Sequence, residues 1–191
     1  MKEQEKPLEQ RPEDCKRAQS LIPLVPKDEF FMNNIICEKK NYQVFEVKPK
    51  NFTISLEVVG AFIECNSQYL LLYRSEDKKQ GKTWCLPGGK VEKSESLESA
   101  VIRETYEETK ITLKPQGLKK IGQLFIRHES LKDYVFHIYY QKLSFPQKVH
   151  LSPEHQHYCW QDLKAAKALP LIDSGKESLE YFERQLYTAY K

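Results

Sequence analysis

The sequence predicts an α/β (α+β) domain in which strand pairs and helices follow one another along a single chain of 191 residues. Three observations support this fold class. Short apolar runs with the pattern of strands recur between Ile54 and Trp160. The segment from Ser96 to Thr109 has the residue spacing of a helix. Turn-forming residues, such as those around Pro87, separate these segments.

The first 50 residues differ from the rest, and we assign residues 1–50 to an N-terminal extension. Residues 1–18 are charged and punctuated by prolines, so we expect them to be disordered or loosely attached. Pro23 and Pro26 should keep the next stretch extended. The stretch Tyr42 to Val47 alternates like a strand, and a lone strand is unstable. We therefore expect it to pair with the main sheet or with another chain.

The remaining residues, 51–191, are expected to form the main domain. Its strands are predicted at 54–65, 69–73, 83–86, 121–127, 134–141 and 158–160. Its helices are predicted from Ser96, which can cap the first turn, to about Thr109, and at 162–169 and 175–190. Connecting segments are predicted as a turn at 66–68, a polar loop at 75–82 and a tight turn at 87–89.

Composition and charge argue against several classes of protein. No apolar run approaches the roughly 18 residues that a membrane span needs, and the charged start lacks the apolar core of a signal peptide. The five cysteines are scattered and contain no CxxC pair, which argues against a disulfide framework and a zinc site. A net charge of +3 is too small to imply nucleic-acid binding. We expect a cytoplasmic protein that binds neither membranes nor nucleic acids.

The most informative stretch of the chain is Gly89 to Ile111. On a helix, one face of this stretch begins apolar and ends acidic, with Leu97, Val101, Glu104 and Glu108. Glu104 and Glu108 form a like-charge pair four residues apart, which is unfavourable on an isolated helix. Burial increases the cost, because desolvated carboxylates need a compensating charge. A hard divalent cation such as Mg²⁺ supplies that charge, so the glutamates predict a metal site.

The spacing of these residues resembles the signature of the Nudix hydrolases. That signature reads Gly, five residues, Glu, seven residues, Arg-Glu, apolar, any, Glu-Glu, any, Gly, apolar. Its positions are filled here by Gly89, Glu95, Arg103, Glu104, Glu107, Glu108 and Ile111. Two positions depart from the family pattern. Thr105 replaces an aliphatic residue, and Lys110 replaces a glycine that suits a left-handed helix end, at a cost of roughly 1–2 kcal/mol.

The resemblance implies a Nudix-like α/β/α sandwich, with a mixed sheet between helices, that hydrolyses a nucleoside diphosphate-linked compound with Mg²⁺ or Mn²⁺. Carried over by position, the implied metal ligands are the Gly89 carbonyl, Glu104, Glu107 and Glu108. The implied catalytic residues are Glu104, which is a candidate base, Glu107 and Arg103, which would hold the carboxylates by charge-assisted hydrogen bonds.

Further candidates could bind the substrate: Arg74, Gly88, Lys90, Glu154 and Asp173. Arg74 stands where Nudix triphosphatases keep a phosphate-binding arginine, although it also fits an ordinary surface arginine. Glu154 lies in a loop where relatives carry an acidic residue that reaches the metals, which makes it a second candidate base, or it is a solvated carboxylate. Asp173 stands where nucleotide-sanitising relatives read the base, or it begins a helix. His155 and His157 suggest a metal pair, but loop histidines more often face solvent or cap a strand.

The resemblance favours a nucleoside triphosphate as the substrate, cleaved to a monophosphate and pyrophosphate as in enzymes that clear oxidised nucleotides. ADP-ribose hydrolases tend to have a proline about 16 residues beyond the motif, where Ile126 and Arg127 stand here. Two alternatives remain open. The chain could hydrolyse a sugar nucleotide or a dinucleotide, or it could be a non-catalytic nucleotide-binding regulatory module, although such modules usually lack one of the carboxylates. N-terminal extensions in the family often build a homodimer or cover the substrate cleft.

Overall fold

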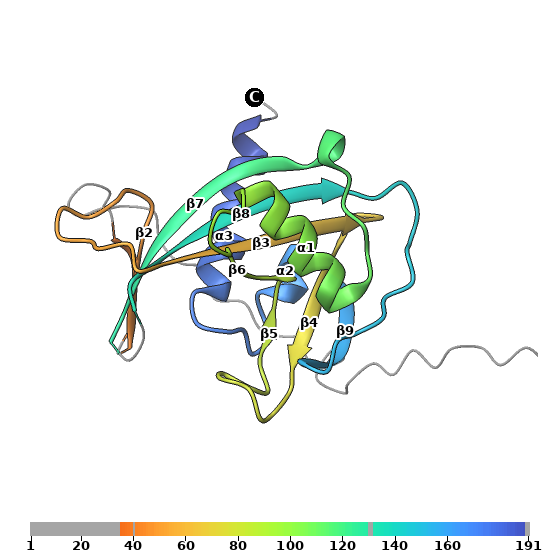
Figure 1. Ribbon diagram of the computed structural model, residues 1–191, viewed down its shortest axis with the longest axis horizontal. Coiled ribbons are helices and arrows are strands. Elements are labelled where there is room, and N and C mark those ends of the chain that lie inside the picture. The colour runs from red at the N-terminus through yellow and green to blue at the C-terminus, as the bar shows by residue number, and fades with distance from the viewer. Residues whose placement is uncertain (1–34, 40, 130–131, 190–191) are drawn as a thin grey trace, which may run out of the picture.

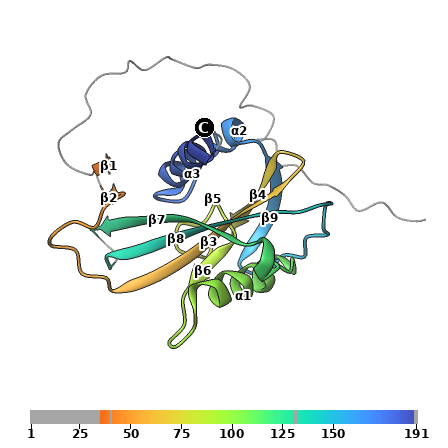
Figure 2. The same ribbon diagram turned by 90° about the horizontal axis from the view of Figure 1, so that it is seen from above.

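The structure is a computed structural model that describes residues 35–39, 41–129 and 132–189. These residues form three layers, with a mixed sheet between helix α1 (Leu97–Thr109) on one face and helices α2 (Leu163–Ala166) and α3 (Gly175–Ala189) on the other (Figures 1 and 2). The predicted α/β/α sandwich is therefore confirmed. Within the described residues, no helix is both long and apolar enough to cross a membrane. The predictions for residues 1–18 and for the stretch at Pro23 and Pro26 lie outside the described residues.

The sheet has nine strands in the described part of the chain. Their bounds are β1 Ile35–Lys39, β2 Tyr42–Phe45, β3 Leu56–Cys65, β4 Gln68–Arg74, β5 Trp84–Cys85, β6 Gly88–Lys90, β7 Lys119–His128, β8 Tyr134–Lys142 and β9 His155–Gln161. The main order is β1-β2-β7-β8-β3-β4-β5, with β6 beside β3 and β9 beside β4. Strands β3 and β8 are parallel, and the other pairs are antiparallel.

The sheet is buried on both faces. Because neighbouring side chains of a strand point to opposite faces, Phe62 and Ile63 of β3 serve two different cores. Phe62 stacks on Phe182 of α3, with ring centroids 3.9 Å apart. Ile63 belongs to the cluster that includes Val101 of α1. The double burial makes the sheet a platform that fixes the position of α1 on one side and of α3 on the other.

Both predicted ends of α1 are confirmed. The Ser96 hydroxyl oxygen accepts a hydrogen bond from the backbone N–H of Ser99 at 3.1 Å, which caps the first turn. Lys110 ends the helix in the left-handed region (φ 61°, ψ 12°), and its N–H bonds the carbonyl of Tyr106. A lysine therefore occupies the conformation that favours glycine.

We expect Lys110→Gly to raise the free energy of unfolding by about 1 kcal/mol, because glycine carries no Cβ that opposes the left-handed conformation. The gain is reduced by the loss of the Lys110 ammonium over the Tyr106 ring, 4.8 Å from its centroid. Urea denaturation measures the change. The control is Lys93→Gly, because Lys93 is exposed and is not at positive φ. A Lys110→Gly protein no more stable than the wild type would contradict the expectation.

The prediction of a tight turn at 87–89 is wrong. Gly88–Lys90 instead forms β6, which pairs with Val58 to Gly60 of β3. The pairing requires a close approach, since a Cβ added to Gly88 would lie 2.1 Å from the carbonyl oxygen of Val59. The backbone of Gly88 also has φ +153°, which side chains disfavour.

The helix predicted at 162–169 is shorter than expected, with α2 covering only Leu163–Ala166. The N–H groups of Ala168 and Leu169 bond carbonyls only three residues back, which tightens the chain at the end of the helix. Pro170 follows, and a proline cannot continue a helix. The predicted strand near Tyr158 is in turn longer, because β9 begins at His155.

The N-terminal part of the sheet was only partly predicted. The strand expected at Tyr42 to Val47 is present as β2, and it pairs antiparallel with β7 of the main sheet. Strand β1 was not predicted, and it pairs with β2. Residues before the predicted boundary at residue 50 therefore extend the main sheet.

Candidate active site

Arg103 of α1 lies at the centre of a network of carboxylates. Its Nε and Nη2 atoms donate to the two oxygens of Glu95, each at 2.9 Å. Its Nη1 atom donates to Glu104 at 2.9 Å and to Glu107 at 3.2 Å. Nη2 also donates to the carbonyl of Lys90 in β6 at 3.0 Å. Arg103 therefore fixes the orientation of the predicted acidic ligands and links α1 to strand β6 by a hydrogen bond.

Glu108 is the most deeply buried carboxylate of the predicted set, at 6% exposure. One of its oxygens accepts a hydrogen bond from the backbone N–H of Gly88 at 2.9 Å. Burial raises the pKa of Glu108 to about 8, and the Gly88 hydrogen bond only partly opposes this. Burial also raises the pKa of Glu104. Two neighbouring carboxylates thus lack a sufficient compensating charge.

The donor groups fit a hard divalent cation, which prefers carboxylate and carbonyl oxygens and would neutralise the buried charge. Gly89 lets the backbone approach them, since a Cβ there would lie 2.5 Å from the Glu104 carboxylate. Glu107 is 56% exposed in its side chain, so its carboxylate can turn without a change in the backbone. In the described ranges, no three His, Cys, Asp or Glu side chains already form a metal-binding group.

The burial of Glu108 predicts how the metal-free protein responds to pH. Its folded-state pKa lies above the unfolded value, so between about pH 4.5 and about 8 the folded state keeps a proton that the unfolded state releases. The free energy of unfolding contributed by Glu108 should fall as pH rises through this window. Denaturation in chelator at pH 5, 7 and 9 measures it. Glu108→Gln should gain stability over the wild type as pH rises, and a constant difference would contradict the assignment.

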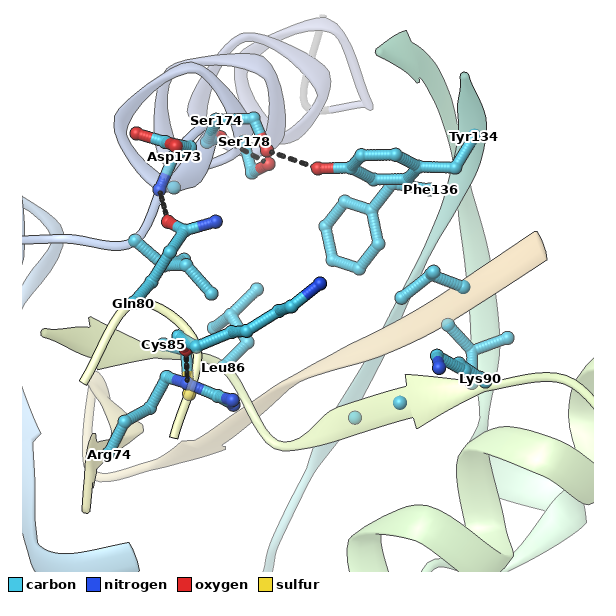
Figure 3. A pocket seen from close by; sticks show the side chains of 17 residues that line it. Arg74, Gln80, Cys85, Leu86, Lys90, Tyr134, Phe136, Asp173, Ser174 and Ser178 are labelled. Atoms are coloured by element: carbon cyan, nitrogen blue, oxygen red, sulfur yellow. Dashed lines mark hydrogen bonds between the residues drawn. The ribbon is translucent and has the colours of Figure 1, made fainter. Parts of the chain in front are cut away.

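A cavity of about 280 Å³ is lined by the three residues of β6, which Arg103 links to the acidic network (Figure 3). Four of the five predicted substrate-binding residues line it: Arg74, Gly88, Lys90 and Asp173. Glu154 does not line it and instead forms an exposed ion pair with Lys78 at 3.0 Å. The cavity therefore extends from strand β6, which contacts α1, to the loop that precedes α3.

Arg74 is the last residue of β4 and lines the cavity. Its Nε donates to the carbonyl of Lys79 at 3.1 Å, which holds the side chain along the loop after β4. The positive charge of Arg74 acts to lower the pKa of Glu108 and of Cys85, so the guanidinium is close to both groups. This position suits contact with an anionic group at the edge of the cavity.

His155 contacts the site in a way that the sequence did not reveal. Its Nε2 lies 3.8 Å from Glu108 and 3.7 Å from the Cys85 sulfur. Burial lowers the pKa of His155 to about 4, so the ring is neutral at pH 7. A register shift between Tyr73 and Arg74 separates His155 from His157, whose ring lies against Tyr73. The two histidines do not form a pair, and no sequence pattern marks the shift.

Comparisons with known proteins agree with this geometry. A family model described as NUDIX domain matches residues 55–182. The CTP pyrophosphohydrolase of Escherichia coli (strain K12) is 29% identical over 128 residues, which cover 66% of this chain and 90% of the relative. The solved MutT protein from Methanosarcina mazei Go1 superposes with a TM-score of 0.62 and 32% identity, covering 69% of this chain and 94% of that one. The solution structure of the E. coli ORF135 protein superposes with a TM-score of 0.60 and 26% identity, covering 74% of this chain and 97% of that one.

Proposed function

The chain belongs to the NUDIX family and is a pyrophosphohydrolase of that family, and we propose that it cleaves a nucleoside triphosphate to the monophosphate and pyrophosphate. One observation carries the proposal: strand β6 (Gly88–Lys90) contacts the acidic face of α1 and also lines a cavity. The cationic side chain of Arg74 lines the same cavity. The likeness to a CTP pyrophosphohydrolase supports the triphosphate as substrate.

A phosphoanhydride resists hydrolysis because its negative charge repels hydroxide. Bound Mg²⁺ or Mn²⁺ would screen the phosphate oxygens and acidify a coordinated water. We propose that Glu104, Glu107, Glu108 and the carbonyl of Gly89 hold the cation. Arg103 keeps Glu104 and Glu107 aligned through its hydrogen bonds. Glu104 is our candidate base, because it is mostly buried and held in one orientation, and Glu154 is a second candidate.

The substrate would lie across β6. Gly88 and Gly89 carry no side chains that would keep a phosphate from the backbone. Lys90 and Arg74 line the cavity and supply positive charge for the phosphates. Asp173 lies in the same cavity, in the segment that precedes α3, and would contact the base. The proposed base site thus lies at Asp173, and the phosphates would lie between Arg74 and Lys90 of β6.

We expect Arg74→Ala to raise KM or lower kcat for nucleoside triphosphates, because the terminal phosphate loses its cationic partner. The loss should be about 10-fold to 100-fold, the range for a hydrogen bond to a charged group. Steady-state kinetics on a triphosphate and on the matching diphosphate measure the effect. The diphosphate lacks the terminal phosphate, so the substitution should reduce activity on the diphosphate less than on the triphosphate. An equal loss on both substrates would indicate a structural role for Arg74.

A substrate panel tests the proposal itself. The panel contains nucleoside triphosphates, nucleotide sugars and dinucleoside polyphosphates, each with Mg²⁺, and kcat/KM is compared across the classes. We expect the triphosphates to be the best substrates. A preference for dinucleoside polyphosphates would instead favour a dinucleotide hydrolase. The likeness to a C. elegans Ap4A hydrolase supports this second candidate function (TM-score 0.54, 26% identity, 70% of this chain and 98% of that one).

A further inference from the structure

Gln80 belongs to the loop between β4 and β5, and the proposed chemistry does not use it. Its side-chain oxygen accepts a hydrogen bond from the backbone N–H of Asp173 at 2.7 Å (Figure 3). A backbone N–H can only donate, so the bonded atom of the amide must be its oxygen. The NH₂ group of Gln80 is thereby fixed in orientation, and it can act only as a donor. Gln80 lines the cavity.

The backbone on both sides of this hydrogen bond adopts an uncommon conformation. Gln80 has φ 53° and Ser174 has φ 63°, both in the left-handed region that non-glycine residues disfavour. The Thr83 hydroxyl donates to the carbonyl of Gln80 at 2.5 Å and helps to hold the loop. Strained residues of this kind persist where the surrounding structure enforces them, often at ligand sites. Here they bring two segments 93 residues apart into contact.

Asp173 supplies an acceptor beside the Gln80 donor. One of its carboxylate oxygens lies 3.1 Å from Nε2 of His128, which anchors the side chain. The side chain is about one third exposed (34%), so it is accessible. Phe136 and Leu86 provide apolar walls of the same cavity. A planar ligand between such walls would meet one fixed donor and one acceptor at its edge.

We propose that Gln80 is a specificity-determining residue, whose NH₂ group donates to an acceptor atom of a nucleobase while Asp173 accepts from a donor group on the same base edge. Base edges present such donors and acceptors in patterns that differ from base to base. The inference rests on the proposed function, because it assigns the base side of the same cavity. In Figure 3, Gln80 and Asp173 lie across the cavity from Lys90. A phosphate bound near Lys90 would therefore leave the base edge free to contact Gln80 and Asp173.

The Gln80→Glu substitution separates recognition from loop anchoring. The new carboxylate still accepts the Asp173 N–H, but it replaces the donor with an acceptor. Gln80→Met, which has neither group and no charge, is the second variant. Gln116→Glu is the matched control, because Gln116 is exposed in the short helix η2 (Pro115–Gly117) and undergoes the same change of charge.

Calorimetry with AMP, GMP, CMP and UMP tests the inference without any hydrolysis. We expect the wild type to prefer one or more bases and both Gln80 variants to bind the preferred monophosphate at least about 10-fold more weakly, the effect of losing one hydrogen bond. Ribose 5-phosphate, which has no base, should bind equally to all proteins. The Gln116→Glu protein should match the wild type.

Two outcomes would overturn the inference. One is unchanged affinity ratios among the four monophosphates in both Gln80 variants, which would leave Gln80 as a loop anchor. The other is a wild type that binds none of the four at millimolar concentration. Base preference that depends on Gln80, in a protein that hydrolyses no triphosphate, would support this inference and refute the proposed function.

Discussion

Glu104→Gln and Glu108→Gln are each expected to lower turnover at saturating Mg²⁺ by on the order of 10²–10³-fold, because a bound cation contributes several kcal/mol to transition-state stabilisation. Glu104 is half-buried and Glu108 is buried on the acidic part of α1, and Glu108 also bonds the N–H of Gly88. Pyrophosphate release measures turnover, and a Mg²⁺ titration measures the accompanying loss of metal affinity.

The fold should survive these substitutions. Glutamine conserves the shape of each side chain and relieves the repulsion between the two carboxylates. Glu98→Gln is the matched control, because Glu98 is exposed in the first turn of α1 and undergoes the same change of charge. The control should keep the wild-type rate. Near-wild-type rates for both Glu104→Gln and Glu108→Gln would show that the metal assignment is wrong.

Removal of all residues before Ile54 is the second change with a large expected effect. Tyr42 and Val44 of β2 are buried in the core beneath α3. Phe45 and Phe52 are buried in a third cluster against β7 and β8. The fragment should lose at least about 3 kcal/mol of unfolding free energy, the usual cost of deleting even one buried aromatic side chain. Urea denaturation measures the loss, and light scattering detects any change in oligomeric state.

A chain that lacks only residues 1–18 is the control, and we expect it to match the full chain in stability and activity. A fragment that starts at Ile54, with full activity, unchanged stability and unchanged mass per particle, would contradict the expectation. The family model begins at residue 55, whereas the sheet in the described residues begins at β1. We therefore propose that residues 35–50 stabilise the family domain even though they precede it.

Local features of the structure could be predicted from the sequence. The ends of α1 follow from Ser96 and from the left-handed residue Lys110, because each makes its hydrogen bond to a residue within one turn of the helix. The contact of Arg103 with Glu107 follows from helical spacing, whereas its contact with Glu95, which precedes the helix, was not predicted. The acidic half of the site could be predicted because a single helix carries most of it.

Features that depend on distant pairing could not be predicted. The strand β6 at Gly88–Lys90 exists only because β3 lies beside it. His155 reaches Glu108 through a register shift between β4 and β9, which no local pattern encodes. Gln80 meets Asp173 only after the sheet brings the β4–β5 loop to the start of α3. The base side of the cavity is therefore a product of tertiary structure.

Product analysis after metal depletion tests most directly whether the acidic face of α1 releases pyrophosphate. The protein is treated with chelator, dialysed, and incubated with a nucleoside triphosphate in the presence or absence of Mg²⁺, and the products are separated by anion exchange. We predict no turnover without the cation, and equal amounts of nucleoside monophosphate and pyrophosphate with it. Release of orthophosphate and nucleoside diphosphate, or an equal rate without Mg²⁺, would contradict the proposed function.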